Sequence, residues 1–201
     1  MKGMSSSARE KPRVAVVLGP WSSGTSAVAG AVAALGANAH PPFVRLNDPR
    51  TKVSYESRAL RQIFGEMFDH KLLARIGTPR WIDARLRVWA GPGLSVAKVP
   101  MLTWFLPEVM SAWDARFVIV RRGLEAIEAT RERRGWPSEY GRKGAERIYS
   151  LIRDGLPGSV PRLEVDFDTL LGQPVETGDR LATFLDLPLA PERVTSVIRR
   201  G

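Results

Sequence analysis

The sequence predicts an α/β fold with three layers, in which helices flank both faces of a mostly parallel central sheet. Short apolar segments typical of buried strands alternate along the chain with segments whose apolar residues recur at helical spacing. This alternation favours parallel strands joined by helical crossovers, which cover both faces of the sheet. A loop with two glycines, residues 19–26, joins the first apolar segment to the first helix, and open parallel sheets bind ligands at such positions.

Local signals define the individual elements. An apolar run at 14–18 ends at a glycine, and Gly36 is a fitting terminator for the first helix. Two stretches, 37–53 with three prolines and 77–93 with two tryptophans, match neither period and are expected to be loops. We expect strands at 13–18, 94–98, 116–120 and 161–165, and helices at 25–35, about 55–68, 101–112, 124–134, 142–154, 176–186 and 191–200.

Length and composition indicate a soluble globular protein. The chain has 201 residues, 44% hydrophobic and 25% charged, which is enough to bury one core. We interpret residues 1–12 as a flexible lead-in that lacks the apolar core of a signal peptide, and residues 13–201 as a single domain. No apolar stretch approaches the roughly 20 residues of a membrane span. The sequence has no cysteine, so disulfides and thiolate metal sites are excluded and the cytoplasm is the default location.

The net charge of +9 has more than one possible explanation. Nucleic acid is one candidate, because basic domains gain affinity by releasing counterions. The arginines are, however, spread along the chain without interleaved aromatic residues or a helix-turn-helix pattern. A polyanionic small cofactor or an acidic acceptor such as a glycan would account for the same excess, so we expect no nucleic-acid partner.

Residues 19–26, Gly-Pro-Trp-Ser-Ser-Gly-Thr-Ser, have the frame of a phosphate-binding loop. Gly19 and Gly24 let the backbone bend so that successive N–H groups converge on an anion, and the following helix adds the positive end of its dipole. In loops that bind nucleoside triphosphates, a Lys follows the second glycine and contacts the terminal phosphates. Thr25 stands there in this chain, which favours a ligand with fewer phosphates. Another phosphate ligand, or a glycine turn that only packs the helix on the strand, stays open at this point.

The loop resembles the 5′-phosphosulfate-binding loop of sulfotransferases that use 3′-phosphoadenosine-5′-phosphosulfate (PAPS). Bacterial members of this family carry Gly-x-x-Arg-Ser-Gly-Thr-Ser. Ser22 departs from the pattern, because the family normally has Arg or Lys there, against the transferring sulfonate. The resemblance implies a P-loop-type α/β fold and PAPS as a cofactor that binds without a metal. The matching residues are Gly19, Ser23, Gly24, Thr25 and Ser26.

A second segment supports the same resemblance. In the family, an Arg at the end of a strand and a Ser eight residues later bind the 3′-phosphate of the nucleotide. Arg122 and Thr130 have this spacing after the predicted strand at 116–120. A guanidinium offers two parallel donors to a phosphate, and a hydroxyl on the next helix adds a third. The alternative is a solvated basic helix that carries Arg121, Arg122, Arg131, Arg133 and Arg134.

Lys98 is the candidate for the positive charge that Ser22 lacks. The segment 94–100 resembles the family strand that ends in Lys before Pro, which would place Lys98 at the carboxyl edge of the sheet beside the loop. A lysine at a strand end that is simply solvated is the alternative. The segments 165–171 and 179–188 also resemble the end of the family fold.

The catalytic base is expected to be a Glu or a His, as in the family. Asn47, Asp48 and Pro49, followed by Tyr55 and Glu56, resemble pieces that follow the first helix in bacterial relatives, which makes Glu56 the first choice. The second and third choices are His40 and His70, and these two histidines cannot form a zinc site by themselves.

The sequence thus predicts a PAPS-dependent sulfotransferase that transfers sulfonate to a hydroxyl or amine of a small-molecule or glycan acceptor. The stretches 37–53 and 77–93 would be the loops over the acceptor site. Two alternatives stay open. One is a kinase-like phosphotransferase, which Thr25 disfavours, and the other is a catalytically weak nucleotide-binding protein on the same fold, which Ser22 favours. The oligomeric state does not follow from the sequence.

Overall fold

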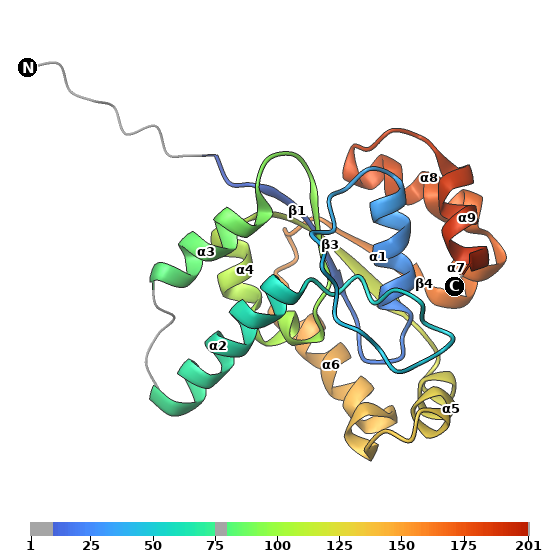
Figure 1. Ribbon diagram of the computed structural model, residues 1–201, viewed down its shortest axis with the longest axis horizontal. Coiled ribbons are helices and arrows are strands. Elements are labelled where there is room, and N and C mark those ends of the chain that lie inside the picture. The colour runs from blue at the N-terminus through green and yellow to red at the C-terminus, as the bar shows by residue number, and fades with distance from the viewer. Residues whose placement is uncertain (1–9, 75–79, 201) are drawn as a thin grey trace, which may run out of the picture.

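The structure, a computed structural model, describes residues 10–74 and 80–200 (Figure 1). Its centre is a four-stranded sheet of order β2-β1-β3-β4 in which every neighbouring pair is parallel. The α/β fold with a parallel central sheet is therefore confirmed. The strands are β1 (Arg13–Leu18), β2 (Ser95–Ala97), β3 (Asp114–Arg121) and β4 (Arg162–Asp166).

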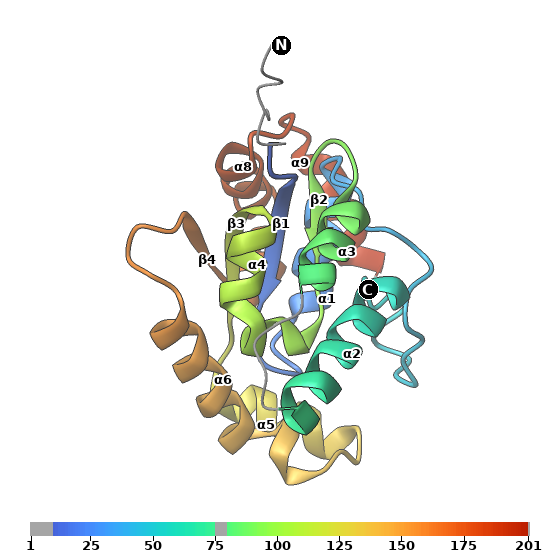
Figure 2. The same ribbon diagram turned by 90° about the vertical axis from the view of Figure 1, so that its left-hand side faces the viewer.

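Helices cover both faces of this sheet, as Figures 1 and 2 show. One face carries α2 (Arg58–Ala74), α3 (Arg80–Ala90), α4 (Leu106–Ala112) and α6 (Arg142–Gly155), and the other carries α1 (Thr25–Ala34), α8 (Pro174–Leu185) and α9 (Pro191–Arg200). The short α7 (Phe167–Gly172) follows β4, and α5 (Leu124–Arg133) lies beyond the carboxyl ends of the strands. Two 3-10 turns, η1 (Pro100–Phe105) and η2 (Ser138–Tyr140), complete the chain. No helix within the described ranges is long and apolar enough to cross a membrane.

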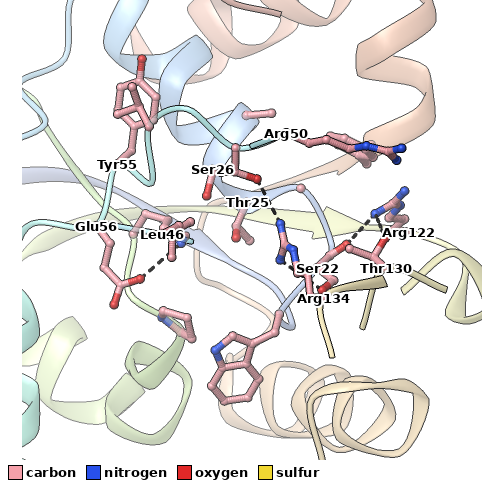
Figure 3. Close-up of a pocket in the computed structure, with 18 of the residues that line it drawn as sticks. Ser22, Thr25, Ser26, Leu46, Arg50, Tyr55, Glu56, Arg122, Thr130 and Arg134 are labelled. Carbon is pink, nitrogen blue, oxygen red and sulfur yellow. Dashed lines mark hydrogen bonds and ion pairs between the residues drawn. The ribbon is translucent and has the colours of Figure 1, made fainter. Parts of the chain in front are cut away.

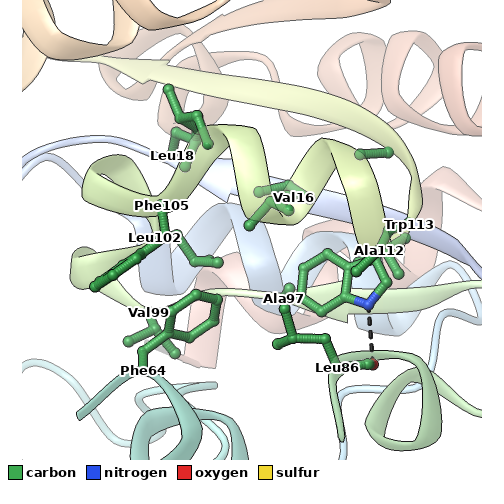
Figure 4. Close-up of a cluster of buried hydrophobic side chains, with 14 of the residues drawn as sticks. Val16, Leu18, Phe64, Leu86, Ala97, Val99, Leu102, Phe105, Ala112 and Trp113 are labelled. Atoms are coloured by element: carbon green, nitrogen blue, oxygen red, sulfur yellow. Dashed lines mark hydrogen bonds between the residues drawn. The ribbon is translucent and has the colours of Figure 1, made fainter. Parts of the chain in front are cut away.

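The period of two along β1 divides the core into two clusters. Val14, Val16 and Leu18 point to the face with α2, α3 and α4, whereas Ala15 and Val17 point to the face with α1. Both sets are buried, because a parallel strand between two helical layers has no solvent side. Figure 4 shows the larger cluster.

Trp113 is the largest side chain of that cluster. Its indole N–H donates to the carbonyl of Leu86 at 2.9 Å, so burial leaves no unpaired donor on the ring (Figure 4). Phe64 and Phe105 pack beside it with ring centroids 5.5 Å apart.

The predicted strands are all present, and β3 begins two residues earlier than expected. The prediction of a loop over 77–93 was wrong for residues 80–90, which form α3. Residues 77–79 lie outside the described residues. Ile82, Leu86 and Ala90, spaced four apart, form the buried face of α3. This helical spacing is the signal in the sequence that indicates the helix.

Three other helices differ from the prediction. The helix expected at about 55–68 is α2, which begins at Arg58 and continues to Ala74. The helix expected at 101–112 divides into η1 and α4, because Pro107 lacks an N–H and starts a new helix at its first turn. The sequence analysis missed α7, which Asp166 caps by accepting a hydrogen bond from the backbone N–H of Thr169 at 2.8 Å.

The parallel strands bring three loops to one edge of the sheet. The segments after β1, β2 and β3 begin at Gly19, Lys98 and Arg122. Since β1 lies between β2 and β3, the carboxyl ends of these strands face the same space, and the crossover direction reverses there.

Candidate functional site

The loop 19–24 connects β1 to α1 and turns at two residues with positive φ, Ser22 (66°) and Gly24 (93°). Gly24 is the N-cap of α1, and a Cβ at this position would overlap the ring of Phe167. A glycine is therefore required for both the backbone conformation and the close packing. The first backbone hydrogen bond of α1 is donated by Ala27 to the carbonyl of Gly24 at 3.0 Å. The N–H groups of Thr25 and Ser26 precede it in the first turn and are the kind of helix-terminal donors that can bind an anion.

A pocket of about 1050 Å³ opens beside this loop. It is large enough for a nucleotide together with a second small molecule. Among the described residues that line it, Glu56 is the acidic one, whereas seven are basic, so the pocket attracts anions. The basic lining residues are Arg50, Lys52, Arg61, Lys98, Arg122, Arg133 and Arg134.

Most of the residues predicted from the sequence line this pocket. Gly19 and Ser23 are not among the lining residues; Ser23 is buried, and a Cβ at Gly19 would come within 2.7 Å of its hydroxyl. The segment 46–53 contributes to the rim, as expected for part of the stretch 37–53. The predicted residues in the lining are Ser22, Gly24, Thr25, Ser26, Glu56, Lys98, Arg122 and Thr130.

Arg122 links the loop to α5. Its guanidinium donates to the carbonyl of Ser22 at 2.7 Å and to the hydroxyl of Thr130 at 3.2 Å, and it stacks 4.8 Å from the ring centre of Phe167 (Figure 3). Burial lowers the pKa of Arg122, an effect that Asp168 opposes and Arg134 and Arg133 reinforce. Its buried Nε has no hydrogen-bond partner within the described ranges, and this charged donor is therefore available to a ligand.

Lys98 and Glu56 form a buried ion pair on the other side of the pocket. The ammonium of Lys98 lies 3.5 Å from one carboxylate oxygen of Glu56, and Arg61 lies 3.6 Å from the other. The side chains of Lys98 and Glu56 are 7% and 8% exposed. Burial lowers the pKa of Lys98, although the carboxylate of Glu56 partly offsets this. The lysine is thus not a solvated strand end, and its charge is engaged by Glu56.

A second buried carboxylate, Asp48, holds the end of α5. It accepts from Arg133 at 3.1 Å and from Nε of Arg134 at 2.7 Å, and the N–H of Arg50 adds a third contact at 3.1 Å. Burial by itself would raise the pKa of Asp48, but these hydrogen bonds outweigh it and lower the pKa well below its usual range. Arg134 also donates to the hydroxyl of Ser22 at 3.4 Å (Figure 3).

The sequence analysis treated Arg134 only as part of a basic run and Asp48 only as part of a motif. The available signal was the spacing of four between Thr130 and Arg134, which puts both on one face of a helix. The residues that Arg134 contacts cannot be found from local spacing, because Asp48 and Ser22 are more than 80 residues away from it in the chain.

An aromatic wall lines the pocket next to the loop. The ring of Trp21 lies 6.1 Å from that of Trp104 and 4.8 Å from that of Tyr140, which in turn contacts Trp136 at 5.9 Å. We call Trp21, Trp104, Trp136 and Tyr140 the aromatic wall. Trp89, in the stretch expected to cover the acceptor, packs instead on Trp113 and does not line the pocket.

His40 is not brought together with these residues. Its Nε2 lies 2.8 Å from the hydroxyl of Ser95, the first residue of β2, and its ring stacks on Trp89. This is the amino-terminal edge of the sheet, opposite the loop. Burial lowers the pKa of His40, opposed by a hydrogen bond to the backbone of Ala90. The side chain of His70 lies outside the described residues.

The solved structures that resemble this protein share one fold. No protein-family model and no curated protein matches the sequence. The structure is similar to the sulfotransferase domain from the Synechococcus PCC 7002 olefin synthase, with a TM-score of 0.58 and 18% identity over 96% of this chain and 80% of that one. It is also similar to the sulfotransferase domain from the curacin biosynthetic pathway, with a TM-score of 0.52 and 18% identity over 92% of this chain and 77% of that one.

The third similar structure is sulfotransferase STF9 from Mycobacterium avium, with a TM-score of 0.55 and 13% identity over 95% of this chain and 67% of that one. The first and third likenesses cover 96% and 95% of this chain. The chain therefore has the fold of sulfotransferase domains, as the resemblance of its loop predicted.

Proposed function

We propose that this protein is a sulfotransferase that binds PAPS in the pocket beside the loop 19–24 and transfers its sulfonate to a hydroxyl or amine. The observation that carries the proposal is the contact between Arg122, Thr130 and the carbonyl of Ser22. It connects the predicted 3′-phosphate residues to the predicted 5′-phosphosulfate loop, and all three residues line one pocket.

The residues present fit this ligand. The first-turn N–H groups of α1 and the hydroxyls of Thr25 and Ser26 would hold the 5′-phosphosulfate, since the helix dipole favours an anion there. Arg122 and Thr130 would hold the 3′-phosphate, and the unpartnered Nε of Arg122 supplies a donor for it. PAPS, when bound, supplies the activated sulfonate. Seven basic side chains against one acidic one match its negative charge.

Glu56 is the proposed general base. Its carboxylate lines the pocket, and its contacts to Lys98 and Arg61, at 3.5 and 3.6 Å, are long enough to leave lone pairs for an acceptor proton. Lys98 would orient this carboxylate. His40 is not proposed for this role, because it lies at the opposite edge of the sheet.

The aromatic wall would bind the body of the acceptor. Its rings present apolar faces next to Ser22, the loop residue beside the sulfonate position. We therefore propose an acceptor whose hydroxyl or amine is carried on an apolar or planar framework rather than on a bare glycan.

Binding of adenosine 3′,5′-bisphosphate tests the proposed function without knowledge of the acceptor. We expect it to raise the melting temperature without magnesium and to bind more tightly than adenosine 5′-monophosphate, because only the bisphosphate engages Arg122. Arg122→Ala should weaken its binding by about 1.5–3 kcal/mol in calorimetric titration.

Arg121→Ala is the matched control, since Arg121 pairs with Glu164 and does not line the pocket. Equal affinity for the two nucleotides would contradict the 3′-phosphate assignment. Binding of ATP only with magnesium would favour the phosphotransferase alternative, and tight bisphosphate binding without turnover would favour a nucleotide-binding protein.

A further inference from the structure

Ser22 leaves the loop without a cation at the position where the resemblance expects Arg or Lys. Transfer of a charged group needs donors that are already in place where charge moves, because their reorganisation would otherwise add to the barrier. Three cations lie near enough to be considered. They are Lys98, Arg122 and Arg134, all of which line the pocket.

Lys98 and Arg122 already have other tasks. The ammonium of Lys98 is buried against the carboxylate of Glu56. Arg122 donates to the loop carbonyl of Ser22 and to Thr130, and its guanidinium stacks on the ring of Phe167. Neither side chain contacts the Ser22 hydroxyl in the described structure.

Arg134 contacts the Ser22 side chain itself. Its Nη1 is 3.4 Å from the Ser22 hydroxyl, so the guanidinium lies against the side chain that stands where the resemblance expects Arg or Lys. Its positive charge also contributes to lowering the pKa values of Lys98 and Arg122. The guanidinium is therefore close enough to interact electrostatically with both residues. Figure 3 shows it beside Ser22 and close to Arg122 and Thr130.

The position of Arg134 is fixed on three sides. Nε donates to Asp48 at 2.7 Å, Nη2 donates to Thr51 at 3.0 Å, and the guanidinium stacks 4.6 Å from the ring centre of Trp136. The side chain is only 12% exposed. Nη1 is thus the end of the guanidinium that faces Ser22, and the other end is anchored.

We propose that Arg134 is the catalytic cation of this site and binds the sulfonate from the end of α5, in place of the loop residue that Ser22 replaces. This inference rests on the proposed sulfotransferase function. Asp48 and Trp136 act as positioning residues that hold the guanidinium against the loop.

The proposed step is a single displacement at sulfur. The acceptor oxygen or nitrogen forms a bond to sulfur while the bond from sulfur to the 5′-phosphate oxygen breaks. The electron pair of that bond leaves with adenosine 3′,5′-bisphosphate, and the acceptor proton passes to Glu56. Arg134 keeps its proton throughout, because a guanidinium does not deprotonate in this pH range, and it stabilises the charge on the sulfonate oxygens.

Nucleotide binding separates this role from that of Arg122. PAPS and adenosine 3′,5′-bisphosphate differ by the sulfonate alone, so the ratio of their affinities reports the contact to that group. Calorimetric titration without acceptor should show that Arg134→Ala weakens PAPS binding by about tenfold and bisphosphate binding by less than about threefold. Arg133→Ala, which removes another partner of Asp48 but no contact to Ser22, should leave the ratio unchanged.

Rescue from the loop provides the second test. In the Arg134→Ala background, Ser22→Arg should restore the affinity ratio and most of a turnover loss of ~10²–10³-fold. In the wild-type background the same substitution should change turnover little, because the cation is already present. The melting temperature of each variant shows whether it is folded, and the affinity ratio remains measurable in a destabilised but folded variant.

The outcomes distinguish this inference from the proposed function. If the wild-type protein binds no bisphosphate, the proposed function fails. If it binds the bisphosphate but Arg134→Ala leaves the affinity ratio unchanged, Arg134 is not the sulfonate cation and the proposed function stands. If Ser22→Arg restored the affinity ratio and turnover of a Lys98→Ala variant but not those of Arg134→Ala, the sulfonate cation would be Lys98.

Discussion

Asp48 and Glu56 are two buried carboxylates whose cations line the pocket, and they meet those cations in different ways. The side chain of Asp48 is 2% exposed and accepts from Arg133 and Arg134 at 2.7–3.1 Å, with further contacts from Arg50 and Thr51. The side chain of Glu56 is 8% exposed, and its two cations lie 3.5 and 3.6 Å away.

The difference assigns different tasks to two similar groups. Short charge-assisted hydrogen bonds occupy the lone pairs of Asp48, so this carboxylate can hold the protein together but cannot accept a proton readily. The contacts of Glu56 are at the limit of hydrogen bonding and leave acceptor capacity toward the pocket. The cations also differ, because burial lowers the pKa of Lys98 whereas the arginines that pair with Asp48 stay charged.

The largest effect should be on turnover in Glu56→Gln. The amide keeps the shape of the side chain and removes the base, so we expect turnover to fall by ~10²–10⁴-fold. The affinity for adenosine 3′,5′-bisphosphate should stay nearly unchanged, because the base contacts the acceptor and not the nucleotide. Release of the bisphosphate from PAPS, with an acceptor found by screening aryl and alkyl alcohols and amines, provides the rate. A large loss of nucleotide affinity would instead place Glu56 in fold support.

Asp48→Asn should give the largest loss of stability. It leaves two guanidinium groups without their buried counter-charge, and breaking such a pair costs about 3–5 kcal/mol in the free energy of unfolding. Urea denaturation measures the loss. Asp154→Asn is the control, because its pair with Arg153 is 66–70% exposed and should contribute less than about 1 kcal/mol. Equal losses in the two variants would remove the distinction between Asp48 and a surface carboxylate.

Glu56→Gln should cost less stability than Asp48→Asn, and its cost should decrease as the pH rises. Without the carboxylate, burial lowers the pKa of Lys98 further, so the unfolded chain binds more protons than the folded protein and stability rises with pH. We expect a cost of about 1–3 kcal/mol at pH 7 that shrinks toward pH 9. Denaturation curves of the wild type, Glu56→Gln and Asp48→Asn at pH 7 and pH 9 check this. A cost of Glu56→Gln that does not change with pH would mean that Lys98 finds another partner.

The smallest effect concerns acid. The pKa of Asp48 is lowered in the folded protein, so its contribution to stability is complete above the unfolded pKa, near 3.8, and is lost as the pH falls below that value. The difference in unfolding free energy between wild type and Asp48→Asn should therefore shrink by about 1 kcal/mol between pH 5 and pH 3. A constant difference over this range would show that the pKa of Asp48 is not lowered by folding.

Local patterns predicted much of the fold and part of the site. The four parallel strands, the loop that turns at Gly24, and the proximity of Arg122 to Thr130 all follow from residues close together in the chain. These features depend on hydrophobic period, helix spacing and glycine conformation, which operate within about one or two turns of the chain. Helix α3 was missed although its buried stripe has the same kind of signal.

The tertiary structure alone decided which distant residues meet. It placed His40 at the edge opposite the loop, joined Lys98 to Glu56 across 42 residues, and brought Arg134 to Ser22 across 112. Such contacts depend on strand order and on the packing of α5 beyond the sheet, and neither leaves a periodic trace in the sequence. The sequence by itself therefore determined the frame of an anion site, and the assembly of the sheet decided which cations and which carboxylates surround it, because charges on separate elements are paired only when those elements pack.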